Sequence, residues 1–279
     1  MKFITVATEI KGYLPVLQES FIKHDLKLEI LGLNEKWTGF GFKYLKMIEF
    51  LKKQNPDEIV VFMDAYDVIF LNKDKLLERF RSYNKQILLS CEPLPKTLLH
   101  KYLYTKVFPS CQLDTKDKIH INSGLYMGYA KYLLIMLQKL SSKANLHSSK
   151  TDDQVILNEF CNYKNKFFCD YIAIDVERKV FYNIFPDSLF TQKTSKKLIN
   201  NKFVNHNLQE VNFLHGPGNT NLDFVVQKYN LNSTNKIFRE DFSSNAVKIY
   251  YTYFWKEILI AILIVILIGY LLIKYLKSK

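Results

Sequence analysis

The chain has 279 residues, of which 48% are hydrophobic and 15% aromatic, and it contains only 9 glycines and 7 prolines. This composition excludes a largely disordered or collagen-like chain and is sufficient for one large folded domain. The formal net charge is +12, yet the lysines are spread along the chain and form no recognisable nucleic-acid-binding motif. We therefore expect no nucleic-acid partner and attribute the charge to solvation and to attraction of anionic nucleotides and membrane surfaces.

The N-terminal part alternates between strand and helix patterns. Phe3 to Thr8 is a predicted strand, Leu14 to His24 a predicted helix and Leu28 to Leu33 a second strand. A β-α-β opening implies a parallel sheet. The first residues lack the long apolar stretch of a signal peptide.

A segment with two glycines precedes the next predicted helix, which runs to Lys53. It contains Trp37, Gly39, Gly41 and Lys43. The glycines permit close approach of the backbone to a ligand, and Lys43 on the following helix could reach a phosphate. A turn is the commoner reason for such a glycine pair, so the segment needs support from elsewhere in the chain.

The run from Val60 to Val68 is the most informative stretch, because apolar residues lead into Asp64 and Asp67. Such a run predicts a buried central strand, and in α/β sheets ligands collect beyond the carboxyl ends of the strands. Carboxylates at that position suit Mg²⁺ or Mn²⁺. The alternative is that both aspartates are turn or capping residues.

The remaining pattern alternates further strands and helices. It predicts a helix over Lys73 to Ser82, a strand over Ile87 to Cys91, a loop-rich stretch over Glu92 to Lys118, a turn feeding a strand over His120 to Ala130, a helix over Lys131 to Leu140, a helix from Asp152 to about Cys161 and a short strand over Val211 to Leu214.

Three polar residues at element ends are candidate site residues. Asp152 and Asp153 open a helix, where carboxylates are also explained by capping. His215 follows a short strand and precedes glycines, so it is a candidate metal ligand, although a lone histidine is more often structural. The four cysteines lack the spacing of a zinc site and leave the redox compartment open.

The C-terminal region predicts a membrane anchor. Ile258 to Ile273 is uncharged and apolar, and with its flanks it reaches about 19 residues, or roughly 28 Å as a helix. Aromatic residues precede it and lysines follow it, as at membrane interfaces. We expect a catalytic domain over 1–243, a juxtamembrane segment over 244–257, a transmembrane helix over 258–276 and a basic tail over 277–279.

The side of the membrane on which the domain lies is less well indicated. A single C-terminal span with a short tail favours insertion after synthesis and a cytosolic domain. The lysines of the tail argue weakly for the opposite orientation. A glycosylation sequon begins at Asn232 and is meaningful only for a lumenal domain.

The order of four motifs, FMDAYDVIF, HINSGLYMGYA, TDDQ and FLHGPGN, resembles the glycosyltransferase domain of the procollagen lysyl hydroxylase family and, more loosely, the collagen-type galactosyltransferases. The resemblance extends from about Lys2 to Tyr229. It implies an α/β GT-A fold with a mixed, mostly parallel sheet, a UDP-glucose or UDP-galactose donor, and Mn²⁺ or Mg²⁺. The residues after Tyr229 are too few for the iron-dependent jelly-roll module of the animal enzymes.

The resemblance also implies roles for single residues. These are metal binding by Asp64, Asp67 and His215; donor binding by Trp37, Gly39, Gly41 and Lys43; contact of Tyr66 with uracil or ribose; contact of Asn122, Ser123 and Gly124 with the donor sugar; donor contacts of Gly216 and Gly218; and a catalytic position beside the sugar and acceptor for Asp152 and Asp153. The chemistry agrees, since metal and lysine stabilise a departing diphosphate and a carboxylate can orient an acceptor hydroxyl. Retention at the anomeric carbon is the outcome the resemblance implies.

One motif departs from the family. The last motif usually reads His-Gly-Asn-Gly-Pro, whereas Pro217 occupies the asparagine position here and Asn219 follows two residues later. The lysine expected beyond it is replaced by Thr220, Asn221 and Leu222. Donor choice could therefore differ.

Our interpretation is a membrane-anchored, metal-dependent hexosyltransferase whose acceptor is a hydroxyl, for example that of hydroxylysine or its galactosyl form. One alternative is a catalytically silent module that binds a nucleotide-sugar or a protein. A nucleotidyltransferase is another, but the glycine-rich, basic phosphate loop that we would expect is missing. A composition rich in Lys, Asn, Ile, Phe and Tyr suits an AT-rich genome such as that of a large DNA virus or a protist, and a GC-rich coding gene would contradict that origin.

Overall fold

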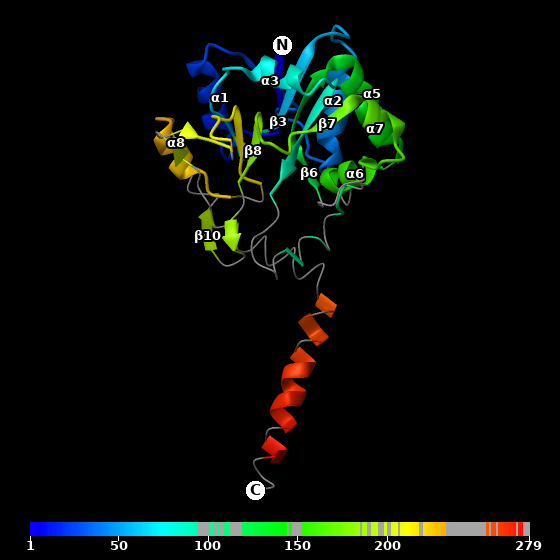
Figure 1. The fold of residues 1–279 in the computed structure, drawn as a ribbon, viewed down its shortest axis with the longest axis vertical. Coiled ribbons are helices and arrows are strands. Elements are labelled where there is room, and N and C mark those ends of the chain that lie inside the picture. Colours follow the sequence, from blue (N-terminus) through cyan, green and yellow to red (C-terminus); the bar gives the residue numbers. More distant parts are fainter. Residues whose placement is uncertain are drawn as a thin grey trace. The chain divides into compact units, whose positions relative to one another are not determined.

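The structure is a computed structural model in which the chain forms two units, Met1–Phe238 and Arg239–Lys279 (Figure 1). Each unit is described by itself. The described residues are 1–93, 101–102, 105, 109–111, 119–143, 145–146, 152–184, 186–188, 191–194, 198–199, 202–205, 207–217, 220–232, 255–256, 258–260, 262–271 and 273–275.

A mixed sheet forms the centre of the first unit. In the described part of the chain it has six strands in the order β2-β1-β3-β6-β5-β7. Their bounds are β1 Lys2–Val6, β2 Leu28–Leu31, β3 Ile59–Asp64, β5 Ile87–Glu92, β6 His120–Tyr129 and β7 Ile172–Ile174. Three of the five pairings are parallel, and only those of β6 with β3 and β5 are antiparallel. The expected α/β class with a mixed, mostly parallel sheet is confirmed.

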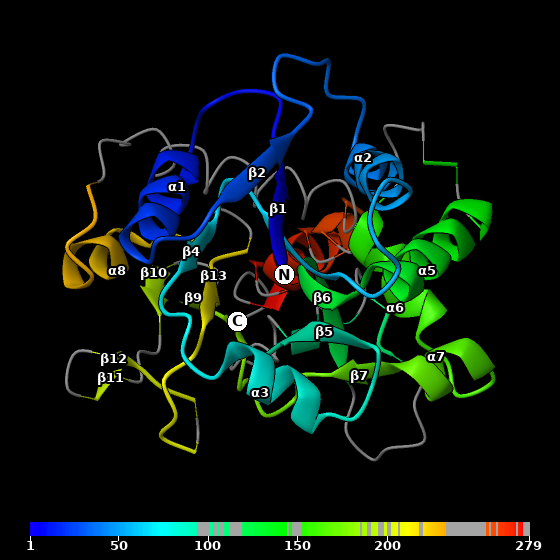
Figure 2. The ribbon, with the colours of Figure 1, turned by 90° about the horizontal axis from the view of Figure 1, so that it is seen from above.

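Helices cover both faces of this sheet (Figure 2). One core packs α2 (Gly41–Leu51), α5 (Ala130–Lys143), α6 (Asp153–Phe160) and α7 (Lys166–Tyr171) on one face. A second core packs α1 (Leu14–Lys23) and α3 (Leu76–Ser82) on the other. Because both faces are covered, β3 is buried along its whole apolar run, as that run predicted.

A smaller sheet follows the main one. It joins β4 (Val68–Phe70), β13 (Phe213–His215) and β8 (Phe181–Asn183), with β13 antiparallel to β4 and parallel to β8. Helix α8 (Asp223–Lys228) contributes to the core beside this sheet. Two short hairpins, β9–β10 and β11–β12, span Pro186–Ser188 with Thr191–Thr194 and Leu198–Ile199 with Lys202–Phe203. The smaller sheet brings His215 to the end of β3, because β4 begins directly after Asp67 and its first residue, Val68, pairs with His215.

Two expectations from the sequence need correction. The stretch from His120 was expected to begin as a turn, but the whole of β6 is strand, held by pairing with both β3 and β5. The strand ending at Cys91 extends by one residue to Glu92, which pairs with His120. Most of the loop-rich stretch after Glu92 lies outside the described residues.

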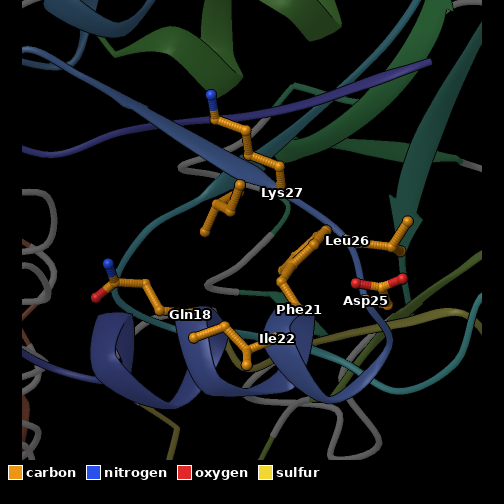
Figure 3. Close-up of a pocket in the computed structure, with 7 residues that line it drawn as sticks. Gln18, Phe21, Ile22, Asp25, Leu26 and Lys27 are labelled. Carbon is orange, nitrogen blue, oxygen red and sulfur yellow. The ribbon is translucent and has the colours of Figure 1, made fainter.

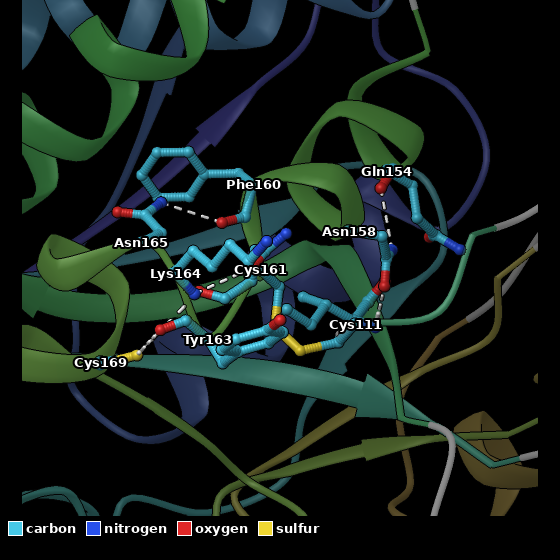
Figure 4. Close-up of a disulfide and its surroundings, with 11 residues drawn as sticks. Cys111, Gln154, Asn158, Phe160, Cys161, Tyr163, Lys164, Asn165 and Cys169 are labelled. Atoms are coloured by element: carbon cyan, nitrogen blue, oxygen red, sulfur yellow. Dashed lines mark hydrogen bonds between the residues drawn. A yellow bond between two sulfur atoms is a disulfide. The ribbon is translucent and has the colours of Figure 1, made fainter. Parts of the chain in front are cut away.

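A disulfide joins Cys111 to Cys161, the C-cap of α6, across 50 residues of sequence (Figure 4). Cys111 also forms a bridge with Ile119, just before β6. Asn158 on α6 both donates to and accepts from the backbone of Ile121 on β6. The C-terminal half of α6 is therefore fixed to the sheet at two points, which positions the opposite end of the helix.

A surface pocket of about 450 Å³ lies between α1 and the start of β2 (Figure 3). It is lined by Gln18, Phe21, Ile22, Asp25, Leu26, Lys27 and Leu28. These residues are at the amino end of β2. Ligands of α/β sheets bind at the carboxyl ends of the strands, so this pocket is not the expected place for the site.

Among the described residues of the second unit, one helix, Ile258–Tyr275, is long and apolar enough to cross a membrane, with a mean hydropathy of 2.8. The large apolar side chains described in this helix are exposed. The remaining part of the proposed juxtamembrane segment lies largely outside the described residues.

Candidate functional site

Asp64, Asp67 and His215 meet where β3 ends. One ligand atom from each lies within 4.8 Å of the others. Asp64 is the last residue of β3, and His215 is the last residue of β13. The backbone N–H of Gly216 donates to the carbonyl of Asp67 at 2.8 Å, which holds the loop between the aspartates beside the histidine. Sequence positions far apart are thus brought to one edge of the sheet, as the predicted metal site requires.

His215 is 2% exposed, and its Nε2 atom is 3.2 Å from Asp67 Oδ1. Within the described residues, Nε2 has no well-aligned hydrogen-bond partner. Burial is the largest single effect and would lower the pKa of His215, but the charge and hydrogen bond of Asp67 together with the charges of Asp64 and Glu92 outweigh it, so the pKa is above its ordinary value. The buried Nε2 atom and the two carboxylates form a set of ligand atoms that suits a divalent cation, which would take the place of a proton on Nε2. The residues present therefore fit Mn²⁺ or Mg²⁺.

Gly124 forms the wall of this cluster. A Cβ atom there would lie 2.5 Å from His215 Cε1 and 2.7 Å from Asp64 Oδ2, so any side chain would displace the cluster. Gly124 lies in a bulge of β6, because Leu89 pairs with Tyr126 and the next residue, Ser90, with Asn122. Bulges next to active sites redirect the strand, and here the bulge brings the backbone against the ligands.

Lys43 on α2 connects the metal-ligand cluster to α6. Its Nζ atom is 2.8 Å from Asp64 Oδ1 and 2.7 Å from Asp153 Oδ2, and the residue is 6% exposed. Burial would lower the pKa of Lys43, yet the charges of Asp153 and Asp64 raise it well above its ordinary value. Lys43 is therefore a fixed cation. The sequence predicted that Lys43 reaches a phosphate. It did not predict that Lys43 lies between two carboxylates.

The two aspartates of the TDDQ motif differ. Asp152 is the N-cap of α6 and accepts from the backbone N–H groups of Gln154 and Val155, so capping accounts for it. Asp153 is 4% exposed and pairs with Lys43, while Tyr44 donates to its backbone carbonyl at 3.1 Å. Asp153 is accordingly the stronger catalytic candidate.

A buried polar group lies beside these residues. Asn122 donates to Glu92 Oε1 at 2.6 Å and to Gln154 Oε1 at 3.1 Å, and its own Oδ1 accepts from the backbone of Gly124. Burial raises the pKa of Glu92 to about 7. Electrostatic interactions of Glu92 with His215 and Asp152 place it near both. Within the described residues, Glu92 Oε2 has no hydrogen-bond partner, so this is the atom that the group leaves for a polar ligand such as a sugar.

The structure gives reasons for the two glycines of the predicted donor-binding segment, but shows no role for its tryptophan. Gly39 has φ +121°, a conformation that favours glycine. Gly41 was expected to permit approach of a ligand, which stays a prediction; a Cβ there would meet the carbonyl oxygen of Leu146 at 2.1 Å, so packing against that backbone also requires a glycine. Trp37 is 40% exposed, with its ring near those of Phe40 and Phe42.

The other predicted contacts are placed as follows. The hydroxyl of Tyr66 bonds the backbone of Thr8 and Glu9 after β1, so the ring is held beside the carboxyl end of the sheet. Ser123 is buried in the β6 bulge. At Gly216 a Cβ would meet Leu222 at 2.9 Å, which again indicates packing. Gly218 lies outside the described residues. Their contacts with a donor stay predictions.

A scan of family models gives one decisive match, because the PLOD GT domain model covers residues 1–237. The chain belongs to the PLOD GT domain family. By family it is therefore a glycosyltransferase domain.

Curated relatives of this PLOD GT domain are longer proteins. It is 27% identical over 198 residues to a Drosophila melanogaster procollagen-lysine,2-oxoglutarate 5-dioxygenase, with 66% of this chain and 25% of the relative covered. It is 33% identical over 166 residues to a Caenorhabditis elegans multifunctional procollagen lysine hydroxylase and glycosyltransferase, with 54% and 21% covered. The chain thus spans about a quarter of the length of these relatives or less.

Solved glycosyltransferases are structurally similar. The galactosyltransferase LgtC, crystallised with donor and acceptor sugar analogues, is 13% identical with a TM-score of 0.47, and 86% of this chain and 99% of that one are covered. A glycosyltransferase involved in glycosylation of the major capsid of PBCV-1 is 10% identical with a TM-score of 0.43, covering 77% and 92%. The family assignment rests on the family model alone.

Sequence reasoning missed three residues that the structure brings to the PLOD GT site: Glu92, Gln154 and Asn183. Glu92 ends a buried strand, which is the signal that identified Asp64. Asn183 is a polar residue inside the apolar run from Val180 to Ile184, and buried polar residues usually have a specific partner. Gln154 follows the recognised aspartates and had no signal of its own.

Proposed function

We propose that the chain is a metal-dependent hexosyltransferase that moves glucose or galactose from a UDP-sugar to an acceptor hydroxyl. The observation that carries the proposal is that three candidate metal ligands, a buried lysine and a buried catalytic carboxylate meet at one edge of the sheet. An Mn²⁺ or Mg²⁺ ion held by Asp64, Asp67 and His215 would neutralise the charge of the departing diphosphate.

The chain's own residues would act around that ion. Lys43 is cationic at any physiological pH and lies against Asp64, so it would add positive charge on the leaving-group side. Asp153 would orient the acceptor hydroxyl or support positive charge at the anomeric carbon, and Asp152 would hold α6 in place by capping it. Asn122 and Glu92 would bond hydroxyls of the donor sugar.

The donor and acceptor that we propose are supported by the family. The names of the relatives include procollagen lysine and glycosyltransferase, which supports a hydroxylysine or galactosylhydroxylysine of a collagen-like protein as acceptor. UDP-glucose and UDP-galactose are the donors that we propose. Pro217, in place of the family's asparagine, adjoins the site and is where donor choice would differ.

The C-terminal helix would tether the enzyme to a membrane. We propose the division into a catalytic domain over 1–243, a juxtamembrane segment over 244–257, a span over 258–276 and a basic tail over 277–279. The sequence alone favoured a cytosolic domain. The Cys111–Cys161 disulfide and the basic tail instead support an oxidising, non-cytosolic compartment, because disulfides persist there.

Donor hydrolysis tests the proposal. The full chain in detergent is incubated with UDP-glucose, UDP-galactose, UDP-N-acetylglucosamine or UDP-glucuronate, with and without Mn²⁺, and released UDP is measured. Release from one of the two proposed donors only with metal is expected. Absence of release, together with absence of UDP binding by calorimetry, would favour a catalytically silent, protein-binding module at the membrane.

A further inference from the structure

The side chain of Asn183 lies between the histidine of the candidate metal site and the main sheet. Its Oδ1 atom is 2.8 Å from His215 Nδ1, and its Nδ2 atom is 2.7 Å from the carbonyl oxygen of Cys91. We propose that Asn183 is a positioning residue that holds His215 in the tautomer able to bind the cation through Nε2. This inference rests on the proposed metal-dependent function.

The backbone places the two side chains together. Strands β8 and β13 are parallel, and Asn183 is the register partner of His215. The N–H of Ile184 donates to the carbonyl of His215 at 2.8 Å, which fixes that register directly beside the site. Asn183 is 1% exposed and His215 is 2% exposed, so water does not compete for their contact.

The bond to Cys91 decides the orientation of the amide. A backbone carbonyl only accepts hydrogen bonds, so the NH₂ group of Asn183 must face Cys91. Oδ1 then faces His215, and because Oδ1 also only accepts, Nδ1 must carry the hydrogen. The carbonyl of Cys91 therefore determines, through Asn183, which nitrogen of His215 is protonated.

The tautomer has a consequence for metal binding. With hydrogen on Nδ1, the neutral imidazole presents its lone pair at Nε2, which faces Asp67 Oδ1 at 3.2 Å within the ligand cluster. A hydrogen bond to the second ring nitrogen fixes the orientation of a metal-binding histidine and raises its basicity. The opposite tautomer would point an N–H group at the site and exclude a cation.

A purely structural role for Asn183 would be to connect β8 to β5 through Cys91. The two roles can be separated because they use different atoms of the amide. Asn183→Asp keeps an acceptor for Nδ1–H and loses the donor to Cys91, whereas Asn183→Leu loses both. Asn183→Ser, whose side chain is too short to reach Nδ1, replaces the leucine variant if that variant does not fold.

The experiment measures Mn²⁺ binding to the full chain in detergent, by electron paramagnetic resonance of free Mn²⁺, without any sugar donor. We expect Asn183→Leu, or Asn183→Ser, to weaken binding about 10- to 100-fold, and Asn183→Asp to bind at least nearly as tightly as wild type. In a His215→Ala background, Asn183→Leu should cost no further affinity, because its effect acts through the histidine.

The outcomes separate this inference from the proposed function. If the wild-type chain binds Mn²⁺ and Asn183→Leu or Asn183→Ser binds it equally well, the inference is overturned while the metal site stands. Equal weakening by Asp and Leu, or an undiminished loss in the His215→Ala background, also overturns it. If wild type takes up no Mn²⁺, the proposed metal site itself fails, and the inference with it.

Discussion

Lys43 Nζ lies 2.7 Å from Asp153 Oδ2 and joins α2 to the first turn of α6. The same ammonium group is 2.8 Å from Asp64 Oδ1, so one buried cation separates a candidate metal ligand from a candidate catalytic carboxylate. Lys43 supplies the positive charge that offsets both carboxylates, of which Asp153 is buried and Asp64 is half-buried. Lys43, Asp64 and Asp153 thus form a triad, which links the position of the candidate metal ligand to that of the candidate catalytic carboxylate.

Replacing Lys43 should destabilise the metal-free protein. Lys43→Met leaves the buried Asp153 and the half-buried Asp64 without their cation, and loss of one partner of a buried ion pair costs about 3–5 kcal/mol. Added Mn²⁺ should restore part of the loss, since it compensates the charge of Asp64. The measurement is thermal unfolding with and without Mn²⁺.

Lys46→Met is the matched control for that variant. Lys46 lies on the same helix but pairs with Glu35 and Glu49 at the surface, so its loss should cost at most about 1 kcal/mol. Equal destabilisation by the two variants would mean that the buried triad contributes no more than a surface pair.

Variants at Asp67 and Asp153 should affect donor binding and sugar transfer separately. Asp67→Ala removes a candidate metal ligand, so metal-dependent binding of the UDP-sugar should be lost. Asp153→Asn keeps the size of the side chain, and should spare donor binding while reducing transfer by at least about 100-fold. Calorimetry and UDP release measure the two steps. Unchanged Mn²⁺-dependent donor binding in Asp67→Ala would refute the metal assignment.

Glu92 should make stability depend on pH. Burial raises its pKa from 4.5 to about 7, so the folded state holds a proton that the unfolded chain releases. Its contribution is fully present below pH 4.5 and is lost as pH rises to about 7. Glu92→Gln should match wild type at pH 4.5 and exceed its stability at pH 8 by roughly 1–3 kcal/mol. Unfolding in the presence of a chelator measures this, and parallel pH profiles of the two proteins would contradict it.

Removing the disulfide should loosen α6. A cross-link spanning 50 residues stabilises by about 4 kcal/mol in the chain-entropy model. Cys161→Ser should therefore lower the free energy of unfolding and, because α6 carries Asp153, reduce transfer more than donor binding. Cys169→Ser, at an exposed free cysteine, is the control. Peptide mapping of non-reduced protein from its native membrane would identify the bond, and finding Cys111 unpaired there would contradict the oxidising compartment.

Local patterns identified much of this fold. The apolar run before Asp64 predicted a buried central strand and its polar end, because the period and length of such a run depend only on neighbouring residues. The order of motifs added the family and hence the approximate topology. The small sheet escaped prediction because β4 and β8 are three residues each, too short for a pattern.

The sequence predicted the candidate metal ligands but not the side-chain contacts that connect them to other parts of the site. Asp64, Asp67 and His215 are recognisable by residue type and motif. The contacts of Lys43 with Asp153 and of Asn183 with His215 depend on how separate elements pack, which residue spacing does not contain. The close approach of Leu146 to Gly41 was not predicted on the same ground, since Leu146 is remote in sequence.

The location of His215 on the small sheet also bears on how the enzyme matures. Asp64 and His215 are roughly 150 positions apart, and contacts of such long range form late because the intervening chain must first be ordered. A chain that has folded only its N-terminal part as far as Asp67, just after β3, would possess the aspartates without the histidine. Cation uptake would then report the last step of folding, so that a newly made enzyme could not hydrolyse its donor before its architecture is complete.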